Sequence, residues 1–262
     1  MTVILETRGL SKSFGAVTAA ANIDMTLQEG EVVGVIGSNG AGKTTFINMV
    51  TGYLRPSSGS ILFRDREITG FSPRRVTRAG ICRSFQVAQL FPELTTLENM
   101  LIAASMLDGS HLAVLHPLKK PSTIDKALKA LDEYGIGNYA DAQVATLPQG
   151  VRKLLDIAMA MLGGPALLLL DEPTSGVAIE EKFGLMDTVM NAVGRSGAAS
   201  LFVEHDMEVI SRYATRVIAF YEGHIIADGP TAEALGHSQV REYIIGTELH
   251  RQPAEGRDHA EN

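Results

Sequence analysis

Residues 31–50 read EVVGVIGSNGAGKTTFINMV, and this stretch contains the pattern that decides the fold. Residues 31–37, EVVGVIG, form a short apolar run rich in Val and Ile, which is typical of a buried strand. Glycines and small polar residues follow, and the apolar spacing after Lys43 is that of a helix. The stretch fits G-x-x-x-x-G-K-[ST] between a strand and a helix, which predicts a loop that binds phosphate.

The loop predicts specific contacts with a phosphate chain. Its backbone N–H groups and the N-terminus of the following helix can surround phosphate oxygens. Lys43 is expected to reach the β and γ phosphates, and the hydroxyl of Thr44 is expected to bind Mg²⁺. A merely flexible glycine-rich turn is the alternative, but the flanking strand and helix favour phosphate binding. The expected phosphate-binding residues are Gly37, Ser38, Asn39, Gly40, Ala41, Gly42, Lys43, Thr44 and Thr45.

Two further apolar runs end in polar residues. ALLLLDE ends at residue 172, and residues 198–206 read AASLFVEHD. Both are interpreted as buried strands, and ligands of open α/β sheets bind beyond the carboxyl ends of such strands. Asp171 is suited to hold Mg²⁺ through water, and Glu172 to polarise an attacking water as general base. An isolated acidic pair is often only a solvated strand end, but the presence of a phosphate loop in the same chain favours a catalytic role for this pair.

The pattern along the chain predicts a layered α/β fold. Strands alternate with helices, as in a parallel sheet covered on both faces. Segments 4–27 and 58–68 alternate in polarity as antiparallel strands do, and segment 217–229 is expected to form a hairpin turning at Glu222 and Gly223. Three helical patterns predict an inserted helical subdomain. The expected divisions are a first core part at 1–95, the helical subdomain at 96–162, a second core part at 163–246 and a flexible tail at 247–262.

Composition limits the classes of function. The 262 residues, 45% of them hydrophobic, can form one large domain or two small ones. A formal charge of −7 argues against a broad nucleic-acid surface. The single cysteine, Cys82, cannot form an internal disulfide, which fits a reducing cytoplasm. The N-terminus lacks the features of a signal peptide, and segment 154–170 is interrupted by Asp156 and by Gly-Gly-Pro, so no membrane span is expected.

The motifs together resemble the ATP-binding subunit of an ABC transporter over residues 3–246. SKSFGAVTAA, the phosphate loop, RSFQ, LPQGV, LLLLDEPTSG and VEHD occur in the order and spacing of that family. GICRSFQVAQLFPELTTLENMLIAA and GPTAEALGHSQVREYIIG are similar to the ATPases of branched-chain amino acid importers. The resemblance implies an α/β fold with a P-loop NTPase (RecA-like) core, an antiparallel β subdomain and an inserted α-helical subdomain. It also implies ATP and Mg²⁺ as cofactors.

The resemblance gives roles to single positions. Phe14 matches the aromatic residue that stacks on adenine, although a core Phe is the alternative. Gln86 matches the glutamine that senses Mg²⁺ and the attacking water. His205 matches the histidine that contacts the γ phosphate, whereas a lone histidine at a strand end is more often structural. Gly150 is the retained glycine of the signature segment, which covers the nucleotide of a neighbouring subunit.

Two departures from the family pattern concern the signature and the loop after the acidic pair. In LPQGV, Pro148 replaces Ser, Gln149 replaces Gly and Val151 replaces Gln, so potential phosphate donors are lost. Each donor lost to a charged acceptor costs about 1.5–3 kcal/mol, which predicts impairment rather than loss of activity. Proline is tolerated in the first turn of a helix, so the helix end can still face an anion. Ala178 stands where an Asp would communicate across the dimer.

The resemblance implies several partners. One phosphate loop and one signature per chain require a second ATPase subunit, in a homodimer or a heterodimer. Permease subunits are expected to dock near Phe91, Pro92 and Leu94, although internal packing of these residues is the alternative. A substrate-binding protein would act indirectly through the permease, and no nucleic acid is expected. The chain is expected at the cytoplasmic face of the inner membrane.

The cargo and the direction of transport stay open at this point. Branched-chain amino acids are the first expectation for the substrate, with other amino acids, amides or urea behind. The alternatives to an importer ATPase are an exporter ATPase, a soluble ABC ATPase and a regulatory subunit without turnover. Intact Glu172 and His205 speak against the last of these.

Overall fold

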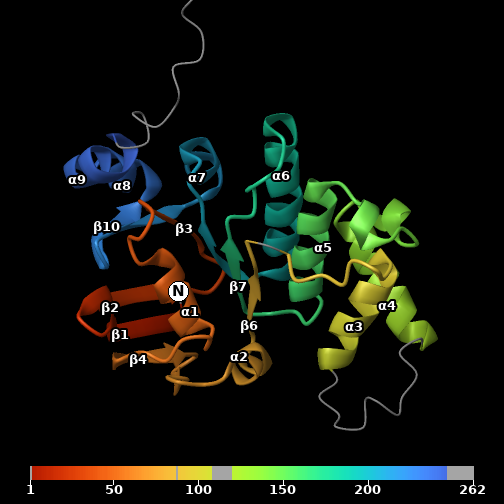
Figure 1. The fold of residues 1–262 in the computed structure, drawn as a ribbon, viewed down its shortest axis with the longest axis horizontal. Coiled ribbons are helices and arrows are strands. Elements are labelled where there is room, and N and C mark those ends of the chain that lie inside the picture. The colour runs from red at the N-terminus through yellow and green to blue at the C-terminus, as the bar shows by residue number, and fades with distance from the viewer. Residues whose placement is uncertain (1, 87, 108–119, 247–262) are drawn as a thin grey trace, which may run out of the picture.

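The fold is built on two β-sheets (Figure 1). The computed structural model describes residues 2–86, 88–107 and 120–246. The antiparallel sheet has the order β2-β1-β4-β5 and comprises β1 (Val3–Phe14), β2 (Val17–Gln28), β4 (Ser58–Phe63) and β5 (Arg66–Glu67). The second sheet has the order β10-β9-β3-β8-β7-β6 and comprises β3 (Val32–Gly37), β6 (Ile81–Ser84), β7 (Leu167–Asp171), β8 (Ala199–Val203), β9 (Arg216–Tyr221) and β10 (His224–Pro230).

Helices follow most strands of the second sheet. The α-helices are α1 (Lys43–Val50), α2 (Pro73–Ala79), α3 (Thr96–Leu107), α4 (Pro121–Glu133), α5 (Gln149–Met161), α6 (Ile179–Ser196), α7 (Met207–Tyr213), α8 (Thr231–Gly236) and α9 (Ser238–Val240). Short 3-10 turns at Gly137–Tyr139 and Val144–Thr146 precede α5, and a π-helical turn at Arg241–Ile245 follows α9. In the described parts of the chain, no helix is long and apolar enough to cross a membrane.

The apolar strands of the second sheet are covered on both faces. Leu168 and Leu170 of β7 pack in one hydrophobic core, and Leu167 and Leu169 pack in the other. Uninterrupted apolar strands are expected wherever both faces of a parallel sheet are buried. One core also contains α1 and the inner side of the antiparallel sheet, while the other contains α5, α6 and α7. The apolar runs of the sequence are therefore strands of the central layer.

The inserted helices lie at the opposite end of the molecule from the antiparallel sheet (Figure 1). Helices α3, α4 and α5 lie between β6 and β7 in the chain, and they pack through buried residues such as Met100, Leu131 and Leu155. We keep residues 96–162 as the proposed limits of a helical subdomain. The expected flexible tail, residues 247–262, lies outside the described residues.

The hairpin prediction is confirmed. Strands β9 and β10 pair in antiparallel register from Tyr221 and His224 outward. Glu222 and Gly223 join them, with φ of 46° and 81°. Positive φ at both residues is what a two-residue type I′ turn requires.

Candidate active site

The order of parallel strands brings the predicted polar residues to one edge of the sheet. Strands β3, β8, β7 and β6 are neighbours in that order and run parallel, so their carboxyl ends lie at the same edge. The phosphate loop follows β3, and Gln86 follows β6. The last residue of β8 is the first of VEHD, and the last residue of β7 is the first of the acidic pair. Segments more than a hundred residues apart in the sequence thus lie side by side at the carboxyl edge of the sheet.

Two glycines fix the shape of the phosphate loop. A Cβ on Gly37 would lie 2.4 Å from the carbonyl oxygen of Phe220, and a Cβ on Gly42 would lie 2.5 Å from that of Ala19. Gly42 also has a φ of 102°, which L side chains rarely adopt. Because the obstructing atoms belong to the backbone, only glycine fits at these two positions. The loop is therefore held against both β9 and β2.

Lys43 begins α1 and turns back over the loop. Its side chain belongs to a residue that is 6% exposed, and its ammonium donates to the carbonyl oxygens of Gly37 and Ser38 at 2.5 and 3.0 Å. Thr44, the next residue, is exposed. An ammonium held at this loop can exchange neutral carbonyl acceptors for charged phosphate oxygens, which form stronger hydrogen bonds.

Glu172 is the centre of a hydrogen-bonded group. Its Oε2 accepts a hydrogen bond from the side-chain amide of Gln86 at 2.6 Å, and its Oε1 lies 3.1 Å from Nε2 of His205. The backbone of Glu172 is left-handed, with a φ of 49°, and its N–H donates to Val203 at 3.0 Å. This conformation turns the glutamate out of the direction of β7. Gln86 and His205, which follow the two strands on either side of β7, therefore both contact the carboxylate of Glu172.

The two residues flanking His205 hold it in place. Glu204 is buried and accepts hydrogen bonds from the N–H and hydroxyl of Thr174 at 2.8 and 2.7 Å. Burial raises the pKa of Glu204, and the bonds from Thr174 oppose this rise. Asp206 caps α7 and pairs with Lys182. Burial alone would raise the pKa of Asp206, but the bonds from Lys182 and the helix N–H groups bring it below its ordinary value.

Asp171 is held by an arginine that the sequence did not single out. One guanidinium nitrogen of Arg83 lies 2.5 Å from Asp171 Oδ2, and another donates to Asn48 Oδ1 at 2.6 Å. Both side chains of the ion pair are nearly buried, with 7% and 8% exposed. The guanidinium also lies 4.8 Å from the ring centroid of Phe85. Arg83 therefore links the end of β7 to α1, the helix of the phosphate loop.

Arg83→Met is expected to lower the free energy of unfolding by about 3–5 kcal/mol, because it leaves the buried Asp171 without its cation. Arg195→Met is the matched control, since its pair with Glu133 is exposed and such pairs contribute less than about 1 kcal/mol. Urea unfolding of both variants without nucleotide checks the difference. Equal losses in the two variants would contradict a structural role for the Arg83 pair.

The signature segment forms the first turn of α5. Pro148 is the N-cap residue rather than the first helical residue, and Arg152 N–H donates to its carbonyl at 3.1 Å. Pro148 and Gln149 are exposed and Gly150 is half-buried. A Cβ on Gly176 would lie 3.7 Å from Cγ of Gln149, so this turn contacts the loop after the acidic pair. The helix start is regular despite the proline, as expected from the sequence.

Phe14 lies at the end of β1, beside the turn to β2. It is 51% exposed, and the ammonium of Lys12 lies 5.1 Å from the centroid of its ring. The alternative of a core Phe is therefore wrong. Strand β2 also approaches the phosphate loop at Ala19. Stacking of Phe14 on adenine stays a prediction.

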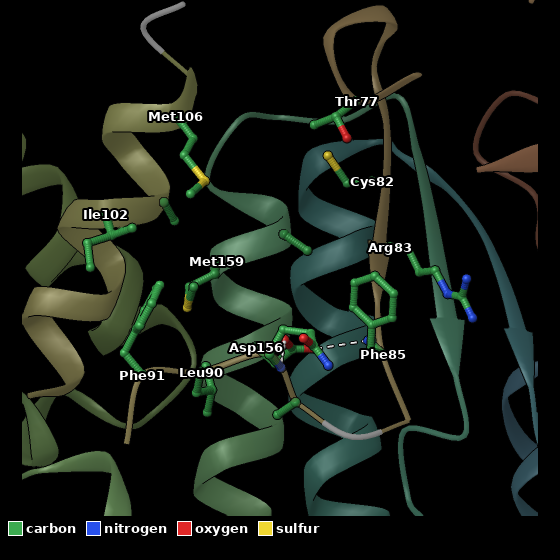
Figure 2. Close-up of a pocket in the computed structure, with 14 residues that line it drawn as sticks. Thr77, Cys82, Arg83, Phe85, Leu90, Phe91, Ile102, Met106, Asp156 and Met159 are labelled. Carbon is green, nitrogen blue, oxygen red and sulfur yellow. Dashed lines mark hydrogen bonds between the residues drawn. The ribbon is translucent and has the colours of Figure 1, made fainter. Parts of the chain in front are cut away.

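A groove of about 500 Å³ lies between β6, α3 and α5 (Figure 2). Apolar residues from all three elements line it, among them Cys82, Ile102 and Met159. Phe91 and Met106, which also line it, are 46% and 70% exposed. Exposed apolar surface of this kind is typical of an interaction site. Of the other two residues expected at a docking surface, Pro92 is exposed and Leu94 is half-buried.

Oxygen donors suited to a hard cation lie at the same edge of the sheet. They are the Thr44 hydroxyl, the Gln86 amide oxygen and the Asp171 carboxylate. In the part of the chain that the structure describes, no group of three or more His, Cys, Asp or Glu could hold a metal ion. A site with a single carboxylate fits Mg²⁺, which is usually bound by one or two carboxylates together with water and substrate phosphates.

The structure gathers most of the predicted residues and adds others. Phe14 and Gly150 lie outside the hydrogen-bonded group around Glu172. Sequence reasoning missed Arg83 and Lys153, both of which contact this group or Asp171. A signal was present for Lys153, because it shares a helix face with apolar residues in VRKLLDIAMAML. Arg83 directly precedes the SFQ of the motif, but nothing in its position indicates which carboxylate it meets.

Comparison with known proteins gives consistent matches over most of the chain. The family model described as ABC transporter matches residues 20–175. The probable branched-chain amino acid transport ATP-binding protein LivG of Archaeoglobus fulgidus is 31% identical, covering 94% of this chain and 96% of the relative. The high-affinity LivG protein of Escherichia coli K12 is 32% identical, covering 93% and 98%. The crystal structure of the ADP conformation of MJ1267, an ATP-binding cassette of an ABC transporter, matches with a TM-score of 0.80 at 29% identity, covering 95% and 99%.

Proposed function

Since the chain belongs to the ATP-binding cassette family of ABC transporters, we propose that it powers an importer for branched-chain or related amino acids. Members of this family are ATPases that hydrolyse ATP to drive transport, and their cassettes work as dimers with transmembrane permease partners. The single observation that carries the proposal is the contact of Gln86 with Glu172 beside an exposed apolar groove. This contact supports a link between the proposed catalytic group and a surface that can receive a partner.

The proposed hydrolysis uses groups from three strand ends. The phosphate loop and Lys43 bind the phosphates of ATP, and Phe14 stacks on its base. Glu172 is the general base that takes a proton from the attacking water, because its carboxylate is partly exposed, at 20%, and is oriented from both sides. Gln86 and His205 fix that orientation through its two oxygens. His205 is then available to contact the γ phosphate.

Mg²⁺ is the proposed metal, and Thr44, Gln86 and Asp171 would hold it. When bound, such an ion neutralises charge on the phosphate oxygens. Asp171 is kept in its place at the end of β7 by Arg83. Arg83 thus maintains a buried carboxylate in position for a cation and connects it to the helix that follows the phosphate loop.

The groove is the proposed docking site for a cytoplasmic segment of a permease subunit. Its lining includes Phe85, which directly precedes Gln86 in the sequence, and Gln89, three residues after Gln86. Its rim is formed by the exposed side chains of Phe91 and Met106. A segment seated there would contact Phe85, the residue bonded to Gln86, so occupancy of the groove would alter the group around Glu172. The proposed location is the cytoplasmic face of the inner membrane, with a substrate-binding protein acting through the permease.

The proposed dimer completes each site with the signature of the other subunit. The first turn of α5, with Gly150, would face the ATP of the neighbour. Whether that neighbour is a second copy or a different ATPase decides which site carries the altered LPQGV.

Pro148→Ser combined with Val151→Gln is expected to raise ATP turnover by at least about tenfold in a homodimer, since even one regained donor to a charged acceptor contributes about 1.5–3 kcal/mol. In a heterodimer the gain is expected only in the partner's site. Steady-state ATPase assays, with the general base of either subunit replaced in turn, distinguish the two cases. Unchanged turnover in every combination would show that the lost donors do not limit hydrolysis.

Co-purification from detergent-solubilised native membranes tests the proposed function. We expect permease subunits in the complex, ATPase activity in the complex, and uptake of branched-chain amino acids by reconstituted vesicles. Phe91→Ser should reduce recovery of the permease, whereas Val3→Ser, at an exposed apolar position of β1, should not. A chain recovered without membrane partners would favour a soluble ABC ATPase, and outward transport would favour an exporter.

A further inference from the structure

Helix α5 contains two buried charged residues that the proposed chemistry does not use. Lys153 is 0% exposed and Asp156 is 7% exposed. They are three residues apart in a helix and therefore lie on the same face. Replacing such charges by apolar residues is often neutral or stabilising, so stability alone does not explain why a lysine is buried here.

Lys153 joins the two residues whose side chains meet at the site. Its ammonium donates to the backbone carbonyl of Gln86 at 2.5 Å and to that of Glu172 at 3.1 Å. The same two residues are joined by the 2.6 Å bond between their side chains. Burial lowers the pKa of Lys153, and the carboxylates around it, first among them Asp156, oppose this shift. Lys153 thus holds the backbones of Gln86 and Glu172 together, and the side chains of the same two residues also bond to each other.

Asp156 holds the neighbouring backbone. Its two carboxylate oxygens accept hydrogen bonds from the N–H of Phe85 at 3.1 Å and from that of Gln89 at 3.3 Å. Figure 2 shows the bond to Phe85 among the residues that line the groove. Burial raises the pKa of Asp156, and these N–H donors oppose the rise. Backbone on both sides of Gln86 is therefore attached to α5.

We propose that Lys153 and Asp156 form a clamp by which the signature helix positions Gln86 and, through it, the carboxylate of Glu172. They are positioning residues, since the hydrogen bonds of their side chains go to the backbone of Gln86, of Glu172 and of the residues beside Gln86, and it is through these residues that they would act. A displacement of α5 would carry the Gln86 backbone with it and would change the orientation of the general base. This inference rests on the proposed function, because it assigns a regulator to the same site.

Lys153→Met tests the clamp in the purified ATPase complex. We expect kcat to fall by about 10- to 100-fold, because a misplacement of about 1 Å can cost a factor of 100, while KM for ATP stays within about threefold. Lys153→Arg should recover part of kcat, since a guanidinium can donate to both carbonyls. Lys129→Met, which removes an exposed lysine of α4, is the matched control and should leave kcat and KM unchanged.

A double-mutant cycle with Gln86→Ala tests the route of the effect. If Lys153 acts through Gln86, adding Lys153→Met to Gln86→Ala should lower kcat far less than it does in the wild type. Additive losses would overturn the clamp. So would a folded Lys153→Met variant, verified by thermal unfolding, with the kcat of the wild type.

Asp156→Asn is a second variant that tests the clamp if Lys153→Met does not fold. The amide retains one acceptor oxygen but faces the second N–H with a donor, so we expect kcat to fall by about 3- to 10-fold with KM unchanged. Unchanged kcat in this variant would overturn the clamp. If Gln86→Ala and Glu172→Gln themselves leave kcat intact, the proposed catalytic assignment fails instead.

Discussion

Glu172→Gln is expected to lower kcat for ATP hydrolysis by about a hundredfold or more, because a positioned general base contributes about 10²–10⁴ to the rate. The amide has nearly the shape of the carboxylate but cannot accept a proton from water. It can keep the contacts with Gln86 and His205. ATP affinity should therefore stay within a few fold of the wild type, and the protein should accumulate as an ATP-bound dimer.

Single-turnover hydrolysis and size-exclusion chromatography with ATP check the two parts of this prediction. Glu233→Gln, at an exposed acidic position in the first turn of α8, is the control and should hydrolyse ATP at the wild-type rate. Turnover of Glu172→Gln within threefold of the wild type would show that another group accepts the proton. His205 would then be the next candidate, because its ring is the neighbour of that carboxylate.

The layers of the fold could be predicted because the sequence patterns there have one physical cause. Strand β7 consists of four leucines and an aspartate, since both faces of the central sheet are buried. The phosphate-loop pattern likewise predicted the strand before it and the helix after it. Its glycines are recognisable in the sequence because close contacts with backbone carbonyls leave no room for a side chain at Gly37 and Gly42. The order of the strands did not follow from the pattern. Parallel apolar strands are interchangeable in sequence, and only the structure places β8 between β3 and β7.

The candidate site could be predicted residue by residue but not as a network. Glu172 and Gln86 were each expected from their motifs, yet their direct contact depends on the left-handed backbone of Glu172, which no residue type there indicates. Arg83 and Lys153 were missed because a single charged residue in a strand or helix usually belongs to a solvated face. Both are buried beneath the site, where their partners are backbone carbonyls or a carboxylate from distant segments.

Lys43→Ala is expected to weaken ATP binding by about a hundredfold or more, because about 3 kcal/mol is lost with two charge-assisted contacts. In the structure the ammonium is already held above the loop by the carbonyls of Gly37 and Ser38. Little rearrangement is then needed for it to meet a phosphate chain that enters the loop. ADP affinity should also fall, because ADP keeps the β phosphate that Lys43 contacts. AMP affinity should change little, because AMP has neither the β nor the γ phosphate.

Isothermal titration with ATP, ADP and AMP separates this role from a general loss of structure. Lys126→Met, which removes an exposed lysine of α4, is the control for loss of positive charge and should bind all three nucleotides normally. If Lys43→Ala weakened AMP binding as much as ATP binding, the lysine would act by shaping the loop. Retention of the ATP affinity in that variant would place the phosphates elsewhere, because the loop has no other side-chain ammonium. A selective loss for ATP and ADP would locate the β and γ phosphates at the N-terminus of α1.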